Sequence, residues 1–171
     1  MIARRIFCLY ALLMIFAPGF PGTAAAMGFF FPETTHKAVE EKAPDFILKD
    51  LTGRSFRLSE QRGKPVLIIF STTWCNSCRA EIPHFKDIHY KYSRRGVEVI
   101  NVDIQEPRDR VARFARRYDL PYRTLLDLDG SVAELYSIFG VPTLILIDGA
   151  GKIVCWQCRT TEAMLEKILQ R

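Results

Sequence analysis

The chain has 171 residues, of which 49% are hydrophobic and 25% charged, enough for one domain with a real core. Its formal net charge of +5 comes without a concentrated basic stripe, which argues against nucleic acid as a partner. Five cysteines are too few for a disulfide-dense scaffold.

The first 26 residues are predicted to be a signal peptide. Arg4 and Arg5 precede the uncharged, mostly apolar run 6–16, and Ala24-Ala25-Ala26 supplies a small-residue cleavage site. The run is shorter than the about 20 apolar residues that span a bilayer. We therefore expect a periplasmic or otherwise exported protein, which contacts the membrane only if this segment stays uncleaved.

Residues 27–42 show no periodicity and are expected to form a linker or N-terminal extension, followed by one domain over 43–171. Cleavage after Ala26 would leave four cysteines, Cys75, Cys78, Cys155 and Cys158. Disulfides persist outside the cytoplasm, and a thiol reductant there must itself be re-reduced.

The regular elements begin with a hairpin. Two short strands, 46–49 and 54–57, flank Asp50-Leu51-Thr52-Gly53, which supplies a turn glycine. The apolar run 66–70 is bounded by turn residues and fits a strand buried on both faces.

Helices and strands then alternate. Pro107 opens a helix whose apolar stripe begins at Val111. The other expected elements are a helix over 75–92, strands over 97–102 and 122–126, a short helix over 132–139, strands over 143–147 and 152–156, and a helix from Thr161. This order predicts an α/β fold with a mixed central sheet flanked by helices on both faces.

The sequence Trp74-Cys75-Asn76-Ser77-Cys78 carries the chemistry. Cys75 follows the buried strand and precedes a helix, where free backbone N–H groups and the helix dipole stabilise a thiolate. Cys78 lies one helical turn further on, within disulfide reach. We expect Cys75 to attack a substrate disulfide and Cys78 to resolve the mixed disulfide.

A zinc site is the alternative for a Cys-X-X-Cys pair. Zinc motifs usually place their second pair about 12 to 20 residues away, whereas 76 residues separate Cys78 from Cys155. The three histidines, His36, His84 and His89, do not stand at ligand spacing to one another. We therefore expect neither a metal nor another cofactor.

Several short, different motifs follow one another along the chain from Ala43 onward. They are Ala43-Pro44-Asp45-Phe46, Leu51-Thr52-Gly53, Leu58-Ser59, Gly63-Lys64-Pro65, Trp74-Cys75-Asn76-Ser77-Cys78, Glu81-Ile82-Pro83, Asp127-Leu128-Asp129-Gly130, Gly140-Val141-Pro142-Thr143 and Gly151-Lys152. In this order and spacing the chain resembles the thioredoxin superfamily, in its TlpA/ResA-like branch of exported reductases and cytochrome c maturation proteins.

The resemblance implies a thioredoxin-like fold and a thiol:disulfide oxidoreductase that reduces disulfides in other proteins. By analogy alone, it implies apocytochrome c as a substrate and a membrane thiol as the electron donor.

The same resemblance assigns roles to further residues. Pro142 matches the family's cis-proline beside the dithiol, and Trp74, Val141 and Pro142 are expected to bind substrate. Glu81 matches the acid near the two sulfurs and shares a helix face with Cys78, so a partly buried carboxylate there would shuttle the proton of the resolving thiol. Pro83 matches the proline that kinks the active-site helix.

Three other functions stay open. The dipeptide Asn76-Ser77 contains no proline, so the reduction potential of related proteins cannot be carried over to this chain. An exported oxidase or isomerase is therefore the main alternative. A peroxide reductase would place a proline at the position of Ile68, and a non-catalytic binding module would not need the two cysteines, Trp74 and Pro142.

The second pair, Cys155 and Cys158, is not required by the family pattern. Ile153, Val154 and Trp156 favour a strand, in which residues three apart stand about 10 Å from each other. A disulfide tolerates roughly 7 Å between Cα atoms. We therefore expect Cys155 and Cys158 to be unbonded and not catalytic, unless the chain turns near Trp156-Gln157.

Overall fold

The structure is a computed structural model that describes residues 41–158 and 161–170. The predicted signal peptide and nearly all of the predicted linker lie outside the described residues. The strands are β1 (Ile47–Asp50), β2 (Ser55–Arg57), β3 (Val66–Ser71), β4 (Glu98–Ile104), β5 (Arg123–Asp127), β6 (Thr143–Ile147) and β7 (Ile153–Trp156). The helices are α1 (Asn76–Tyr92), α2 (Arg108–Arg117), α3 (Ser131–Leu135) and α4 (Thr161–Leu169), with 3-10 turns η1 (Leu58–Gln61) and η2 (Ser93–Arg95).

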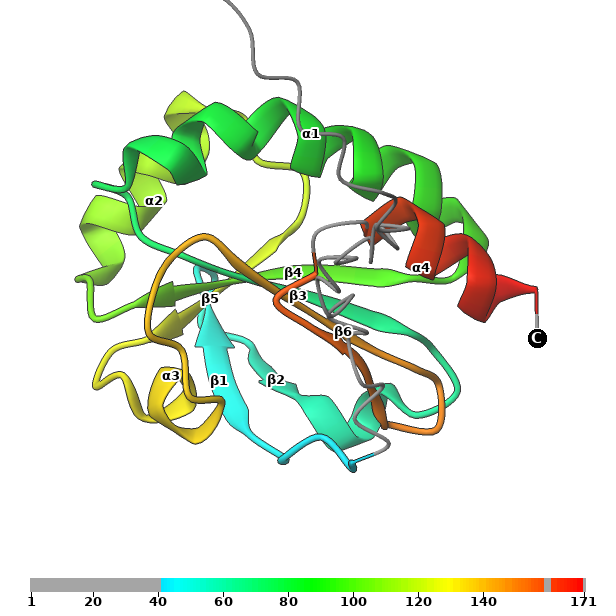
Figure 1. Cartoon of the computed structure of the whole chain (residues 1–171). Helices are drawn as coiled ribbons and strands as arrows, with labels where there is room; N and C mark the ends of the chain where they lie inside the picture. Colours follow the sequence, from blue (N-terminus) through cyan, green and yellow to red (C-terminus); the bar gives the residue numbers. More distant parts are fainter. Residues whose placement is uncertain (1–40, 159–160, 171) are drawn as a thin grey trace, which may run out of the picture. The chain divides into compact units, whose positions relative to one another are not determined.

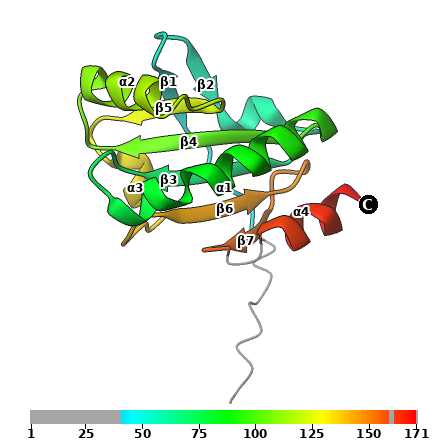
Figure 2. The same cartoon turned by 90° about the horizontal axis from the view of Figure 1, so that it is seen from above.

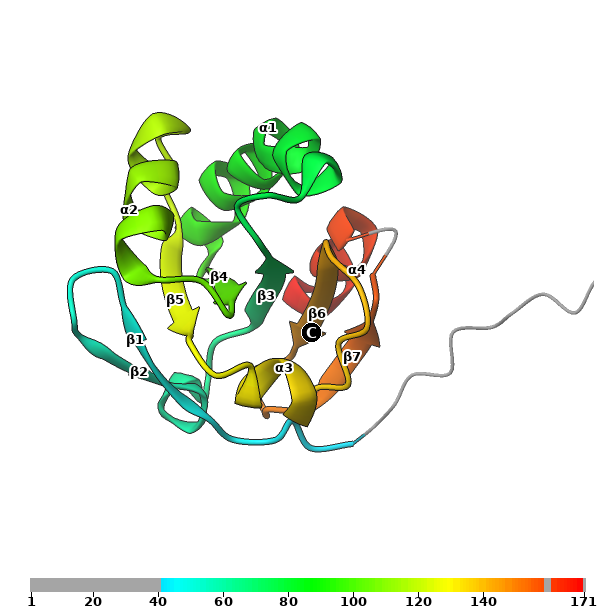
Figure 3. The same ribbon diagram turned by 90° about the vertical axis from the view of Figure 1, so that its left-hand side faces the viewer.

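The strands form one mixed sheet in the order β2-β1-β5-β4-β3-β6-β7 (Figure 1). Strands β3, β4 and β5 run parallel, and every other neighbouring pair is antiparallel. Each parallel step needs a crossover, which α1 and α2 provide. Figure 3 shows α1 and α2 on one side of the sheet and α3 on the other.

Two apolar clusters fill the two faces of this sheet. One gathers Phe85 of α1, Leu165 of α4 and alternate residues of the central strands, such as Ile69. The other places Val132 of α3 against residues such as Ile68. Every residue of β3 is buried, as its continuous apolar run predicts. Figure 2 shows α1 over the middle of the sheet and α4 near its β7 edge.

The expected α/β fold and mixed sheet are confirmed. Strand β6 has the predicted bounds, and the hairpin of β1 and β2 turns at Gly53 with a φ of 85°. The helix predicted over 132–139 is too long, because α3 ends at Leu135 and Ser137 takes a left-handed φ of 47°. Within the described ranges, no helix is both long and apolar enough to cross a membrane.

Candidate active site

Cys75 occupies the N-cap of α1, directly after the loop that leaves β3. Its Sγ accepts a hydrogen bond from the backbone N–H of Cys78 at 3.0 Å, and the Ser77 hydroxyl lies 3.2 Å away as a second donor. These donors and the positive end of the helix dipole stabilise negative charge on Sγ when the bridge is reduced.

Cys75 and Cys78 are joined by a disulfide, with their Cα atoms 5.2 Å apart. Both are buried, with 5% and 3% of their surface exposed, and Cys75 is the more exposed of the two. Beside it, the Val141 carbonyl oxygen lies 3.6 Å from Cys75 Sγ. The Val141–Pro142 peptide bond is cis, as the Gly-Val-Pro-Thr motif predicts.

The loop in front of Cys75 is held by a buried carboxylate that sequence reasoning missed. Glu106 accepts hydrogen bonds from the backbone N–H of Thr73 and from its hydroxyl, at 2.5 and 2.6 Å. Arg79 of α1 donates to the Thr73 carbonyl at 2.8 Å from the other side. Thr73 is therefore fixed from both directions, and Trp74, which follows it, is 66% exposed.

A second acid missed from the sequence is Asp103, near the end of β4 and in register with Ser71 of β3. Burial and the neighbouring Glu106 charge raise the pKa of Asp103 to about 8. Both acids follow from topology, because parallel strands β3 and β4 end at the same edge of the sheet and β3 leads to Cys75.

Glu81 lies on α1 three residues after Cys78, but its side chain is exposed rather than partly buried. Pro83 lies inside the same helix, as expected. Among the described residues, no group of three or more His, Cys, Asp or Glu side chains could hold a metal ion.

The expectation for the second cysteine pair is wrong. Cys155 and Cys158 are joined by a disulfide, with their Cα atoms 5.6 Å apart. Strand β7 ends at Trp156, and Gln157 takes a left-handed φ of 54°, which turns the chain back. The chain is extended through Trp156, as its strand-favouring residues predict, but not at Gln157. The Cα–Cα distance expected for residues three apart in a straight strand therefore does not apply to this pair.

A mixed sheet with a Cys-X-X-Cys pair at a helix N-cap and an adjacent cis-proline defines a thioredoxin-like thiol–disulfide oxidoreductase. Known proteins agree. The AhpC/TSA family model matches residues 39–155. The chain is 40% identical over 134 residues to the thiol-disulfide oxidoreductase ResA of Geobacillus thermodenitrificans, covering 75% of this chain and 77% of that protein. It is 32% identical over 143 residues to ResA of Bacillus cereus, covering 84% and 82%.

Solved structures give the same result. The crystal structure of a thiol:disulfide interchange protein DsbE from Chlorobium tepidum has a TM-score of 0.71 at 28% identity, covering 76% of this chain and 96% of that chain. The thioredoxin domain of a thiol-disulfide oxidoreductase from Bacteroides vulgatus has a TM-score of 0.70 at 28% identity, covering 77% and 98%. The chain belongs to the AhpC/TSA family, and it is a thiol–disulfide oxidoreductase similar to ResA.

Proposed function

We propose that this oxidoreductase is exported and uses the Cys75–Cys78 dithiol to reduce disulfides in other proteins. The observation that carries the proposal is the position of Cys75 Sγ, which accepts the Cys78 N–H at a helix N-cap and lies beside the Val141 carbonyl. The N–H donor and the helix N-cap favour a thiolate at Cys75 only, which gives the two cysteines different roles.

The reaction starts from the reduced pair. The Cys75 thiolate attacks one sulfur of a substrate disulfide, so a Cys75–substrate bond forms and the other substrate sulfur leaves and takes a proton. Cys78 then loses its proton and attacks Cys75 Sγ, which releases the second substrate thiol. The substrate gains two electrons and two protons, and the enzyme is left with the disulfide described above.

Four further residues complete the proposed site. Exposed Trp74 directly precedes Cys75, and the Val141–Pro142 segment lies beside its Sγ, so a substrate chain that reaches Sγ meets all three. Glu81 lies one helical turn from Cys78 on the same face. Because its carboxylate is exposed, we assign it the exchange of the resolving proton with water.

We further propose a place in cytochrome c maturation, with apocytochrome c as substrate and a membrane thiol as electron donor. The support is the resemblance to the TlpA/ResA-like branch and the relatives named ResA and DsbE. Deleting the gene should lower the level of holo-cytochrome c. Normal cytochrome levels alongside another thiol defect would place the enzyme in a different process.

The test of the central proposal is disulfide reduction with purified protein. The protein should reduce insulin disulfides with dithiothreitol as donor, Cys75→Ser should abolish this, and Cys78→Ser should accumulate mixed disulfides through Cys75. Full activity of Cys75→Ser would refute the proposal. A reduction potential measured against glutathione separates a reductase from the alternative, an exported oxidase or isomerase, since an oxidant has the higher potential.

A further inference from the structure

The Cys155–Cys158 disulfide takes no part in the proposed reaction. It closes a ring of the same sequence separation as Cys75–Cys78, but at the end of a strand rather than at the start of a helix. Gln157 inside this ring holds a left-handed backbone, which is uncommon for a residue other than glycine. Such positions gather at functional sites.

A purely structural role does not explain this bridge well. A disulfide stabilises a fold mainly by restricting the unfolded chain, and the effect is smallest for the shortest loops. The segment is also held without it, because Cys155 pairs with Leu146 of β6 and the Cys158 N–H donates to the Leu144 carbonyl at 3.0 Å. The bridge therefore adds little as a crosslink.

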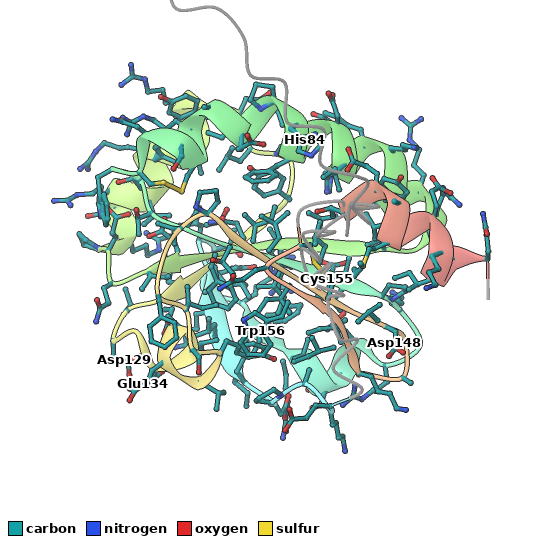
Figure 4. The ribbon with its side chains drawn as sticks, viewed as in Figure 1. His84, Asp129, Glu134, Asp148, Cys155 and Trp156 are labelled. Carbon is teal, nitrogen blue, oxygen red and sulfur yellow. A yellow bond between two sulfur atoms is a disulfide. The ribbon has the colours of Figure 1, made fainter. Side chains whose placement is uncertain are left out.

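The two sulfurs differ in their surroundings. Cys158 lines a shallow groove together with Gln157 and the segment Gly140–Leu144, whereas Cys155 does not. Figure 4 shows Cys155 on the α4 side of the sheet and Trp156 on the opposite side. Cys158 is 9% and Cys155 8% exposed, both more than the 5% of Cys75, so burial does not exclude exchange at this pair and only the groove distinguishes Cys158.

The groove also connects this pair with the first one. Val141 lines the groove that holds Cys158, and its carbonyl oxygen contacts Cys75 Sγ. A partner chain that docks along Gly140–Leu144 therefore reaches the neighbourhood of both bridges.

We infer that Cys155–Cys158 is a second thiol–disulfide exchange site, which takes an external protein dithiol and is attacked at the Cys158 sulfur. A thiolate of the partner forms a bond to Cys158, the Cys155–Cys158 bond breaks, and Cys155 leaves and takes a proton. The second partner thiol then loses its proton, attacks the sulfur of the first and releases Cys158. The partner loses two electrons and two protons, and this pair gains them.

The test uses the full chain carrying Cys75→Ser and Cys78→Ser, with dithiothreitol as the probe dithiol. The oxidised protein is equilibrated in graded mixtures of reduced and oxidised dithiothreitol, quenched with acid, alkylated and mapped by mass spectrometry. Cys155 and Cys158 should gain label together in one two-electron transition, while near-ultraviolet circular dichroism shows a folded protein. If both resist labelling until guanidinium unfolds the protein, or are unbonded after oxidation, the inference is wrong.

Two controls sharpen the result. The matched variant Cys155→Ser/Cys158→Ser should show the transition of the first pair alone, and peptide mapping of the unmodified chain gives the same answer should either variant fail to fold. Because the tested variant lacks Cys75 and Cys78, the outcome does not depend on the proposed function.

The direction of attack is tested separately. In the Cys75→Ser/Cys78→Ser background, Cys155→Ser leaves only Cys158 of the pair, and Cys158→Ser leaves only Cys155. The free Cys158 should react faster with an aromatic disulfide reagent than the free Cys155, since Cys158 alone lines the groove. Equal rates, or a faster Cys155, would overturn the assignment of Cys158 as the attacked sulfur.

Discussion

The Thr73 hydroxyl donates a hydrogen bond of 2.6 Å to Oε1 of Glu106, a residue 33 positions later in the sequence. Glu106 is almost fully buried and lies 3.5 Å from the Arg110 guanidinium. The loop before Cys75 is therefore tied to the segment between β4 and α2, and not only to its own strand.

Replacing this carboxylate should slow the enzyme by loosening the loop. Glu106→Ala leaves the Thr73 N–H and hydroxyl without their acceptor, which should cost about 1–3 kcal/mol of folding free energy. We expect insulin reduction to slow by roughly tenfold, because misplaced reacting groups lose rate steeply. Glu106→Gln keeps one acceptor oxygen, so its stability and its rate should lie between those of the unmodified protein and of Glu106→Ala. An unchanged rate in a destabilised Glu106→Ala protein would show that Glu106 only supports the fold.

Asp103 should make stability depend on pH. The pKa of Asp103 is raised from 3.8 to about 8, so the folded protein binds its proton more tightly than the unfolded chain. This contribution is fully present below pH 3.8 and is lost as the pH rises towards 8, at up to about 1.4 kcal/mol per pH unit.

The variant Asp103→Asn has no proton to lose at this position, so its stability should fall less between pH 4 and 8. Urea unfolding at several pH values measures the difference, with the exposed Asp109→Asn on α2 as the matched control. Equal pH slopes in Asp103→Asn and the unmodified protein would contradict the raised pKa.

Trp74 should matter for protein substrates more than for small ones. Its exposed side chain directly precedes Cys75 in the chain, and exposed aromatic side chains often anchor partners. Trp74→Ala should raise KM for insulin roughly tenfold and change the rate with a small aromatic disulfide less than about twofold. Tyr90→Ala, near the other end of α1, is the control. Equal losses on both substrates would argue against a docking role.

Glu81 should influence the resolving thiol. A carboxylate one turn from Cys78 disfavours a thiolate there, so Glu81→Gln should lower the pH at which reduced Cys78 is alkylated. The fold should stay intact, because the side chain is exposed. Asp87→Asn, an exposed acid further along α1, should leave the titration unchanged. Superimposable titrations of Glu81→Gln and the unmodified protein would make Glu81 an ordinary surface residue.

The sequence predicts the frame of this fold well, because each central element carries its own signal. The apolar run 66–70 becomes β3 with one added residue, and Pro107 stands at the N-cap of α2 as expected. These features depend on local propensity and on the apolar pattern that marks a buried segment, and both are visible in a single sequence. Cys75 at a strand-to-helix junction is predictable for the same reason.

The features that the sequence does not predict depend on long-range contacts or on single backbone angles. Asp103 and Glu106 have no local signal, and they matter only because β4 lies beside β3. The left-handed turns at Ser137 and Gln157 shorten α3 and close the Cys155–Cys158 ring. Neither residue type favours a positive φ, so tertiary packing sets both turns.

The strand order has one more consequence, for solubility. Both edges of the sheet are short strands, with three residues in β2 and four in β7. At β7, Lys42 pairs with Lys152 before the strand begins, and Gln157 turns the chain away after it ends. Short edges flanked by charge offer another molecule little backbone to pair with. The domain therefore gives the strands of another molecule almost no edge on which to aggregate.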